Sequence, residues 1–311
     1  MQAAREQILY PWVDRAGQFS WLKMSVFLGI LLPGSWAAFT WAFGQPTASP
    51  TPSALGAATG GTNAMPVTAA LHLIGLWSVR FLLITLAITP LRRIGGWPRL
   101  VTVRRMIGVA AFAYVAIHFT LYIVQQNFRL LFVANEIILR IYLAIGFVAL
   151  LGLLMLALTS TDSAMRRLGG KKWQRLHYLV YPLTMLGLTH FFLQSKINVT
   201  EPVLMSGIFI WLMLYRLAYH RNGERALSLW QLGGLALAAS LLTLVGEAAW
   251  YQFATGIGGE RILQATFDLR HIRPAWWVLL AGCGILVLKL TADRFWNQRK
   301  AGGRRQMAPA S

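Results

Sequence analysis

The sequence predicts an all-α membrane protein, a polytopic bundle of about eight transmembrane helices. Hydrophobic residues make up 56% of the 311 positions and charged residues only 13%, about half the charged fraction of an ordinary soluble domain. Apolar windows of about 20 residues, long enough to cross a hydrocarbon core as helices, recur along the chain. Basic residues cluster between these windows. The net charge of +19 therefore indicates membrane topology and contact with anionic lipid, and we expect no nucleic-acid binding.

Eight apolar windows mark the predicted spans. They fall near residues 21–43, 68–90, 107–126, 140–159, 174–194, 202–219, 229–250 and 275–293. Pro182 lies inside the fifth window, where a proline can kink a helix. We divide the chain into an N-terminal segment (1–20), six spans (21–219), two additional spans (220–295) and a basic tail (296–311). The first segment is too polar to contain the apolar core of a cleavable signal peptide.

The connections between the spans alternate in charge. Those after the second, fourth, sixth and eighth spans are basic, through Arg92, Arg93, Arg99, Arg104, Arg105, Arg166, Arg167, Lys171, Lys172, Arg175, Arg216, Arg221, Arg225, Arg294, Arg299, Lys300, Arg304 and Arg305. The opposite connections are poor in basic residues: 44–67 has none, 127–139 only Arg129, and 195–201 only Lys196. The connection 251–274 departs from the pattern, with three arginines partly offset by two acidic residues. The positive-inside rule therefore predicts that both termini are cytoplasmic.

Several kinds of site are missing from the sequence. No glycine-rich phosphate loop, dinucleotide fingerprint or soluble domain is evident, so we do not expect the chain to bind a nicotinamide cofactor by itself. The single cysteine, Cys283, lies within a span and excludes a disulfide framework or a cysteine metal site. The connection 44–67 is rich in Pro, Thr, Ala and Gly, which is typical of a flexible external hairpin.

Two histidines lie at matching depth in the third and fifth spans. Both spans run outward from a basic anchor: His118 lies 13 residues past Arg105, and His190 lies 15 residues past Arg175. At about 1.5 Å per residue these depths differ by about 3 Å. Two neutral imidazoles so placed can hold a haem iron from both sides, as a low-spin centre for electron transfer. The alternative is that each histidine is a hydrogen-bonding residue in helix packing.

His177 shares its span with His190 and lies about 20 Å from it along the axis, near the predicted cytoplasmic face. It could be an axial ligand of a second, inner haem, or an interfacial histidine beside lipid headgroups. The matching depth in the third span holds Arg104, Arg105 and Met106. A second bis-histidine site is therefore not predicted.

Further polar residues lie in or near the spans. His72, near the outer end of the second span, is a candidate haem ligand, quinone contact or helix-packing group. Arg80 lies about mid-span, where a guanidinium needs an anion or several acceptors. A haem propionate, a flavin phosphate or backbone carbonyls would each satisfy it. Glu247 is expected at the membrane interface, and His220 and His271 are expected to be solvated.

Five short motifs occur in a specific order and spacing. They are Thr89-Pro-Leu-Arg-Arg93, Val103-Arg-Arg-Met-Ile-Gly108, His118 with Tyr122, Leu158-Thr-Ser-Thr161, and Lys171-Lys-Trp-Gln-Arg-Leu-His-Tyr-Leu-Val-Tyr181 followed by His190. Over about Trp21 to Leu217 they resemble the MsrQ family, formerly called YedZ, within the ferric-reductase-like transmembrane superfamily. The resemblance implies a six-helix ferric-reductase-like haem-binding core, followed by two additional helices.

The resemblance also carries functional expectations. It implies b-type haem, FMN binding, and electrons drawn from the quinone pool in the bacterial inner membrane. Those electrons pass to MsrP, a periplasmic molybdenum-containing partner that reduces methionine sulfoxide in oxidised proteins. His118, His177 and His190 fall on the family's haem-histidine positions, and His72 on another recurring histidine. The wider superfamily usually places two histidines on each of two helices, whereas the third span here has one.

The leading expectation is thus an electron-transfer subunit, with methionine-sulfoxide reduction in the partner. A transmembrane ferric reductase acting on external metal chelates is the first alternative. The missing flavin–nicotinamide domain argues against a self-contained one, although a separate cytoplasmic donor could replace that domain. A proton-coupled transporter is the second alternative, and the lack of evident internal repeats argues against it.

Overall fold

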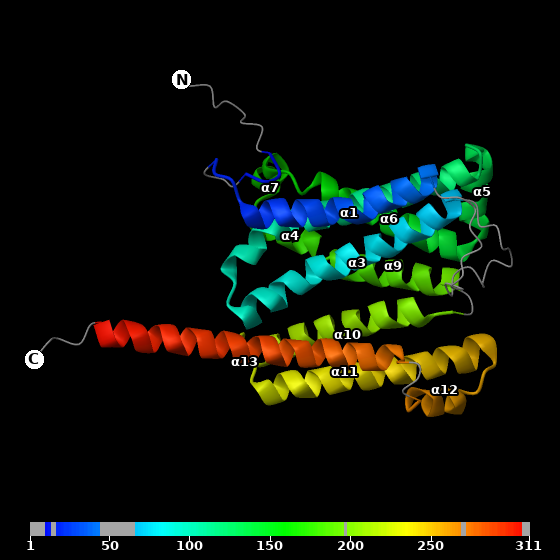
Figure 1. Cartoon of the computed structure of the whole chain (residues 1–311). Coiled ribbons are helices and arrows are strands. Elements are labelled where there is room, and N and C mark those ends of the chain that lie inside the picture. Colours follow the sequence, from blue (N-terminus) through cyan, green and yellow to red (C-terminus); the bar gives the residue numbers. More distant parts are fainter. Residues whose placement is uncertain (1–9, 14–16, 44–65, 196–197, 269–271, 307–311) are drawn as a thin grey trace, which may run out of the picture. The chain divides into compact units, whose positions relative to one another are not determined.

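The computed structural model describes residues 10–13, 17–43, 66–195, 198–268 and 272–306. Within these ranges the regular structure is helical, apart from one isolated bridge between Val13 and Phe19 (Figure 1). Eight of the described helical segments are long and apolar enough to cross a membrane, which confirms the predicted fold class. The predicted hairpin 44–67 lies almost entirely outside the described residues, as does His271.

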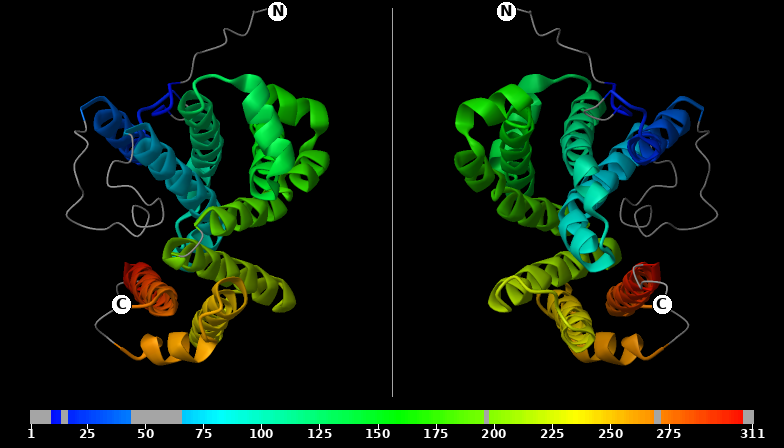
Figure 2. Two further views of the ribbon diagram at one scale, coloured as in Figure 1. Left: turned by 90° about the vertical axis from the view of Figure 1, so that its right-hand side faces the viewer. Right: turned by 90° about the vertical axis from the view of Figure 1, so that its left-hand side faces the viewer.

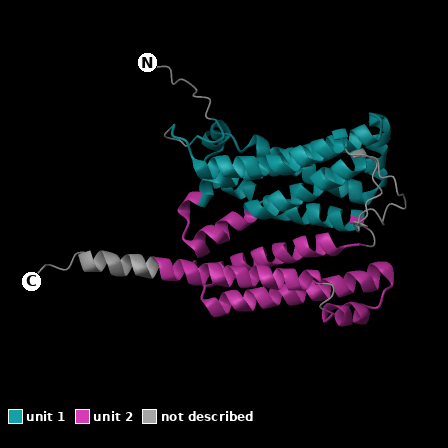
Figure 3. Ribbon diagram, viewed as in Figure 1, with its two compact units in different colours: residues 1–85, 100–194 teal, residues 86–99, 195–311 magenta. Residues whose placement is uncertain are grey.

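The chain forms two compact units, shown separately coloured in Figure 3. The first comprises residues 1–85 and 100–194, and the second comprises residues 86–99 and 195–311. The division predicted at residue 219 separates a six-span core from two additional spans by function, and it stays a prediction.

The first unit holds most of the candidate site residues. Its elements are α1 (Trp21–Phe43), the larger part of α3 (Pro66–Gly95), α4 (Val101–Gln125), α5 (Leu130–Leu139), α6 (Ile141–Leu158), α7 (Asp162–Leu168), α8 (Gly170–His177) and all but the last residue of α9 (Val180–Ser195). The short η1 (Pro98–Leu100) falls mostly in the second unit. The long helices lie side by side along one direction (Figure 1). The end of this unit at which α4 begins, and which contains α7 and α8, is called the basic end. The opposite end, at which α4 ends and α6 begins, is called the α5 end.

A tyrosine hydroxyl connects α1 to α4. The hydroxyl of Tyr114 donates to the carbonyl of Ile30 at 2.5 Å and accepts the N–H of Gly34 at 2.8 Å. In an uninterrupted helix that N–H would bond the Ile30 carbonyl directly, so the hydroxyl is inserted into the α1 ladder beside Pro33. A Cβ at Gly34 would lie 2.9 Å from the hydroxyl oxygen. The close approach therefore requires glycine at this position.

The fifth predicted span is two helices rather than one. α8 ends at His177 and α9 begins at Val180. Pro182 has no N–H to offer the carbonyl of Tyr178, four residues earlier, and its ring collides with that carbonyl in a regular helix. The predicted kink is thus a break just before the proline, and it separates His177 from the helix that carries His190.

Several connections contain helices that the sequence analysis did not predict, among them α7 between the fourth and fifth spans. α5 lies within 127–139, and the π-helix η2 (Tyr251–Thr255) and α12 (Gly259–Thr266) lie within 251–274. α5 is apolar, and its most exposed side chains are also apolar, with Leu131 90% and Ile138 79% exposed. It contacts α6, and its Val133 is buried.

The second unit is a group of packed helices, α10 (Thr200–Arg221), α11 (Leu229–Trp250) and α13 (Pro274–Gln306), shown from two sides in Figure 2. Close contacts at Gly207 and Gly282 hold them together: a Cβ at Gly207 would lie 2.4 Å from the Thr243 hydroxyl oxygen. Glu247, which is expected at the membrane interface, is buried among the helices of this unit. It is only 1% exposed and pairs with Arg273 at 2.8 Å, because a carboxylate removed from water needs a cation.

Candidate functional site

His118 on α4 and His190 on α9 lie close together in the first unit. Their ring centroids are 6.4 Å apart and their planes are nearly perpendicular, at 83°. Metal–imidazole bonds are about 2.0–2.1 Å long. Two such bonds to one ion, plus the radius of each ring, separate the ring centres by a little over about 6 Å. The spacing of the two rings therefore fits ligation of one metal ion from opposite sides.

Hydrogen bonds fix which nitrogen of each ring is available. Nδ1 of His118 lies 2.9 Å from the carbonyl of Leu71 on α3, and Nδ1 of His190 lies 2.7 Å from the carbonyl of Tyr142 on α6. Since a carbonyl only accepts, both Nδ1 atoms carry the hydrogen, and both Nε2 atoms are left with a lone pair. A backbone acceptor on Nδ1 is the usual support for a histidine that binds metal through Nε2.

Two glycines make room for the imidazoles. A Cβ at Gly75 on α3 would lie 2.8 Å from Nδ1 and Cε1 of His118. A Cβ at Gly146 on α6 would lie 2.7 Å from Nδ1 of His190. Each ring thus packs against a bare stretch of helix, close enough to reach its carbonyl partner. The sequence contains these glycines, but their role is visible only when the helices are paired.

The protein alone supplies two ligands rather than a closed metal site. Among the described residues no group of three or more His, Cys, Asp or Glu side chains could hold a metal ion. His72 is close enough to His118 for their charges to interact, without completing such a group. Two opposed imidazoles are what an iron already held by four porphyrin nitrogens requires. The donor set therefore fits haem better than a bare metal ion.

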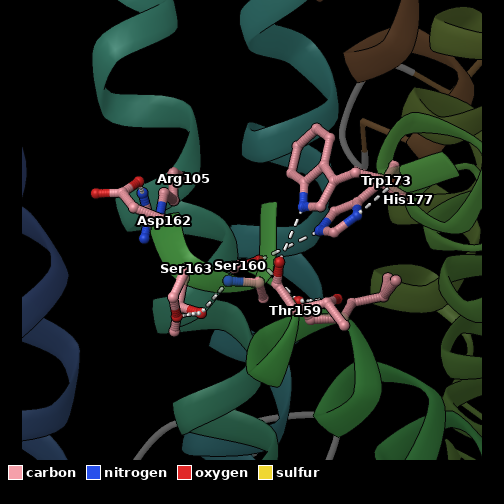
Figure 4. A network of polar contacts seen from close by, with 10 residues as sticks. Arg105, Thr159, Ser160, Asp162, Ser163, Trp173 and His177 are labelled. Carbon is pink, nitrogen blue, oxygen red and sulfur yellow. Dashed lines mark hydrogen bonds and ion pairs between the residues drawn. The ribbon is translucent and has the colours of Figure 1, made fainter. Parts of the chain in front are cut away.

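His177 lies apart from this pair, in a network at the basic end (Figure 4). Its ring stacks on Trp173 with centroids 3.8 Å apart, and its Nδ1 donates to the Trp173 carbonyl at 3.0 Å. Nε2 lies 3.3 Å from the hydroxyl oxygen of Ser160. Trp173 in turn donates from Nε1 to the carbonyl of Thr159 at 2.9 Å. Both nitrogens of His177 thus have protein partners, and iron ligation through Nε2 would replace the contact with Ser160.

Arg80 lies on α3, partly buried, with its guanidinium carbon 5.1 Å from the centre of the Trp77 ring. His220 lies in the last turn of α10 and is exposed, as expected for a solvated histidine.

The sequence analysis missed a polar cluster at the α5 end. Arg140 is ion-paired with Glu136 and donates from Nη1 to the Tyr142 hydroxyl at 3.0 Å. Tyr122 on α4 is an electrostatic neighbour of all three. The available signal was an acidic and a basic residue four positions apart in the mostly apolar stretch that precedes Tyr142.

Comparison with known proteins supports a specific family. A family model described as ferric reductase like transmembrane component matches residues 74–188. The chain is 38% identical over 205 residues to the protein-methionine-sulfoxide reductase heme-binding subunit MsrQ of Rhodospirillum rubrum, covering 66% of this chain and 88% of the relative. It is 42% identical over 166 residues to the subunit of the same name from Xanthomonas campestris pv. campestris, covering 52% and 75%. No solved structure matches the chain.

The first of these relatives aligns over 88% of its own length. The segment of this chain that matches the family model includes His118 and the start of α9. The chain therefore belongs to the MsrQ family, the heme-binding subunits of protein-methionine-sulfoxide reductase.

Proposed function

We propose that this chain is a b-type haem electron-transfer subunit. It takes electrons from the quinone pool, or from a flavin donor, and passes them across the membrane to a periplasmic catalytic subunit of the MsrP type, which repairs oxidised methionines in proteins. The observation that carries the proposal is the opposed pair His118 and His190, each held by a backbone carbonyl and each with a free Nε2.

His118 and His190 are the proposed axial ligands. A haem b held by these two imidazoles would supply one-electron transfer. The carbonyls of Leu71 and Tyr142 keep the two imidazoles in one tautomer and orientation, so that ligation does not change with redox state. With both positions filled by protein, substrate cannot coordinate the iron, which favours electron transfer over chemistry at the metal.

Other residues have subsidiary proposed roles. His72, beside His118, is a candidate cofactor or quinone contact, and Arg80 is a candidate partner for a haem propionate or an FMN phosphate. His177 at the basic end is proposed to support electron entry, as a ligand or neighbour of an inner redox centre. Its position at the opposite end of its span from His190 supports a relay across the bilayer.

The proposed setting is the bacterial inner membrane, with both termini in the cytoplasm. The arginine-rich connections support this orientation, which puts the α5 end and the histidine pair towards the periplasm. The first six membrane spans (21–219) form the proposed haem-binding core, and the last two spans are an addition to it.

The proposal is tested with the purified full chain in lipid membranes. Its haem is first reduced, and MsrP with a methionine-sulfoxide substrate is then added. We expect prompt reoxidation of the haem, and none when either MsrP or the substrate is left out. Reoxidation by ferric chelates alone would instead favour a ferric reductase, the alternative supported by the ferric-reductase-like match over residues 74–188. A chain without any reducible haem band would favour a transporter.

A further inference from the structure

The polar cluster at the α5 end consists of Arg140, Glu136, Tyr142 and Tyr122. It draws on three helices of the first unit: Tyr122 lies on α4, Glu136 on α5 and Tyr142 on α6, with Arg140 between α5 and α6. The Glu136 side chain is only 15% exposed, whereas that of Arg140 is 51% exposed. The cluster thus places a carboxylate inward, and a guanidinium reaches from it towards the surface.

Arg140 has donors left after its partners in the cluster are counted. A guanidinium carries five N–H groups. Nε faces the Glu136 carboxylate and Nη1 donates to the Tyr142 hydroxyl. The hydroxyl of Tyr142 and the carboxylate of Glu136 raise the pKa of Arg140, so it stays charged at any pH the protein meets. The remaining edge of the fork suits the two oxygens of a second carboxylate.

The start of α6 favours an anion at the same place. Arg140 is the N-cap of this 18-residue helix and makes no side-chain capping hydrogen bond. The positive end of the helix dipole therefore adds to the charge of the guanidinium.

The cluster adjoins the histidine pair on both sides. Tyr142 belongs to both: its hydroxyl accepts a hydrogen bond from Arg140, and its carbonyl accepts one from His190. Tyr122 follows His118 by four residues, about 6 Å along α4. A group bound between the two imidazoles and extending by roughly one helical turn towards the α5 end would reach the cluster.

Haem b carries two propionate carboxylates on one edge of the ring. In an apolar bundle an ionised carboxylate needs charged or hydrogen-bonding partners. We infer that Arg140, supported by the hydroxyls of Tyr142 and Tyr122, binds a propionate of the haem held by His118 and His190. Glu136 orients the guanidinium from the inner side. The inference rests on the proposed haem site and fixes the direction of the haem within it, with the propionate edge towards the α5 end.

The test compares haem b with its dimethyl ester, in which both carboxylates are methylated and uncharged. The full-length apoprotein in detergent is titrated with each, and the affinity ratio is measured for the wild type and for Arg140→Gln. We expect the wild type to bind haem b about tenfold more tightly than the ester, as for one hydrogen-bonded charge pair. The ratio should fall to about one in Arg140→Gln. Changing the side chain and the carboxylate separately and together makes a double-mutant cycle, which isolates the interaction between the two.

Matched variants assign the effect to this arginine. Arg129→Gln removes the basic residue that precedes α5, whose guanidinium lies over the Phe132 ring, and should keep the wild-type ratio. Tyr142→Phe removes only the hydroxyl and leaves the carbonyl that supports His190, so its ratio should be intermediate. As a second readout, Arg140→Gln should lower the haem midpoint potential relative to the wild type and Arg129→Gln, because a nearby positive charge favours the reduced haem.

Each other outcome has a definite meaning. A wild type that does not discriminate between haem b and the ester, or an Arg140→Gln ratio equal to that of the wild type, overturns the inference. Loss of discrimination in Arg80→Gln alone would assign the propionates to the mid-span arginine instead. A wild type that binds neither haem b nor the ester contradicts the proposed function itself. Failure of the proposed function can thus be distinguished from failure of the inference about Arg140. If Arg140→Gln does not fold, the affinity ratio of Tyr142→Phe and the haem midpoint potential of Arg140→Lys are measured in its place.

Discussion

Single residues determine whether the two imidazoles can face one another. His118 and His190 each need a carbonyl acceptor on a neighbouring helix, and each carbonyl is within reach only because a glycine lies against the ring. The arrangement of the two histidines is therefore a property of α3, α4, α6 and α9 together. A histidine alone does not make the site.

Replacing the supporting glycines should disturb the haem without touching a ligand. A methyl group at Gly75 or Gly146 would come within 2.8 Å or 2.7 Å of the ring, so the imidazole must rotate or the helices must separate. We expect reduced haem content and an altered low-spin spectrum for Gly75→Ala and Gly146→Ala. Gly187→Ala on α9 is the matched control, since nothing lies within 4 Å of its Cβ position. Wild-type spectra for both test variants would show that the rings do not need this space.

His177 should affect electron entry more than haem retention at the other pair. His177→Ala removes the stack on Trp173 and the contact with Ser160, while His118 and His190 keep all their partners. We expect slower reduction of the haem by a quinol or flavin donor, measured by stopped-flow absorbance, with the outer ligation intact. If haem content and reduction rate are both unchanged, His177 is an interfacial residue without a role in electron transfer.

At the scale of whole helices, prolines and inserted hydroxyls set the local geometry. α1 is joined to α4 by the Tyr114 hydroxyl beside Pro33, and α8 is separated from α9 ahead of Pro182. Both features interrupt the regular hydrogen-bond ladder of an apolar helix, and the backbone groups that are freed need other partners.

Tyr114→Phe should weaken the contact between α1 and α4. The change leaves the ring in place and removes one bond to the Ile30 carbonyl and one from the Gly34 N–H, in a buried setting. We expect a loss of stability of about 1–3 kcal/mol, seen as a lower thermal unfolding midpoint in detergent. Thr120→Val is the control, because its hydroxyl bonds only its own helix at an exposed position. Equal midpoints for the two variants would contradict a linking role for Tyr114.

At the scale of the whole molecule, the sequence predicted the class of fold and the proximity of His118 and His190. Length and hydropathy dictate the spans, because the bilayer imposes them. Depth counted from Arg105 and Arg175 matched His118 to His190, because helical rise is nearly constant. Side-chain support could not be predicted in this way. The carbonyls of Leu71 and Tyr142 become visible as partners only once the helices are paired.

Features of the connections were also beyond the sequence analysis. Charge counts treated 127–139 as a loop, although it forms the apolar helix α5 and part of the Arg140 cluster. Nothing in the local sequence identifies Arg273, 26 residues later, as the ion-pair partner of Glu247.

The orientation of the chain is a prediction for the whole molecule. A reporter that is active only in the periplasm should give a signal when fused after Gly61 and none when fused after Gly169, because basic connections stay in the cytoplasm. The reverse pattern would invert the proposed direction of electron flow and place the histidine pair on the cytoplasmic side.

The most direct test of the central claim is the absorption spectrum of the purified chain and of its two ligand variants. The wild type should show a reducible low-spin haem spectrum. His118→Ala and His190→Ala should both lose it, since each leaves the iron five-coordinate or unbound, and His220→Ala should keep it. A full wild-type low-spin spectrum in either His118→Ala or His190→Ala would contradict ligation of one haem by this pair.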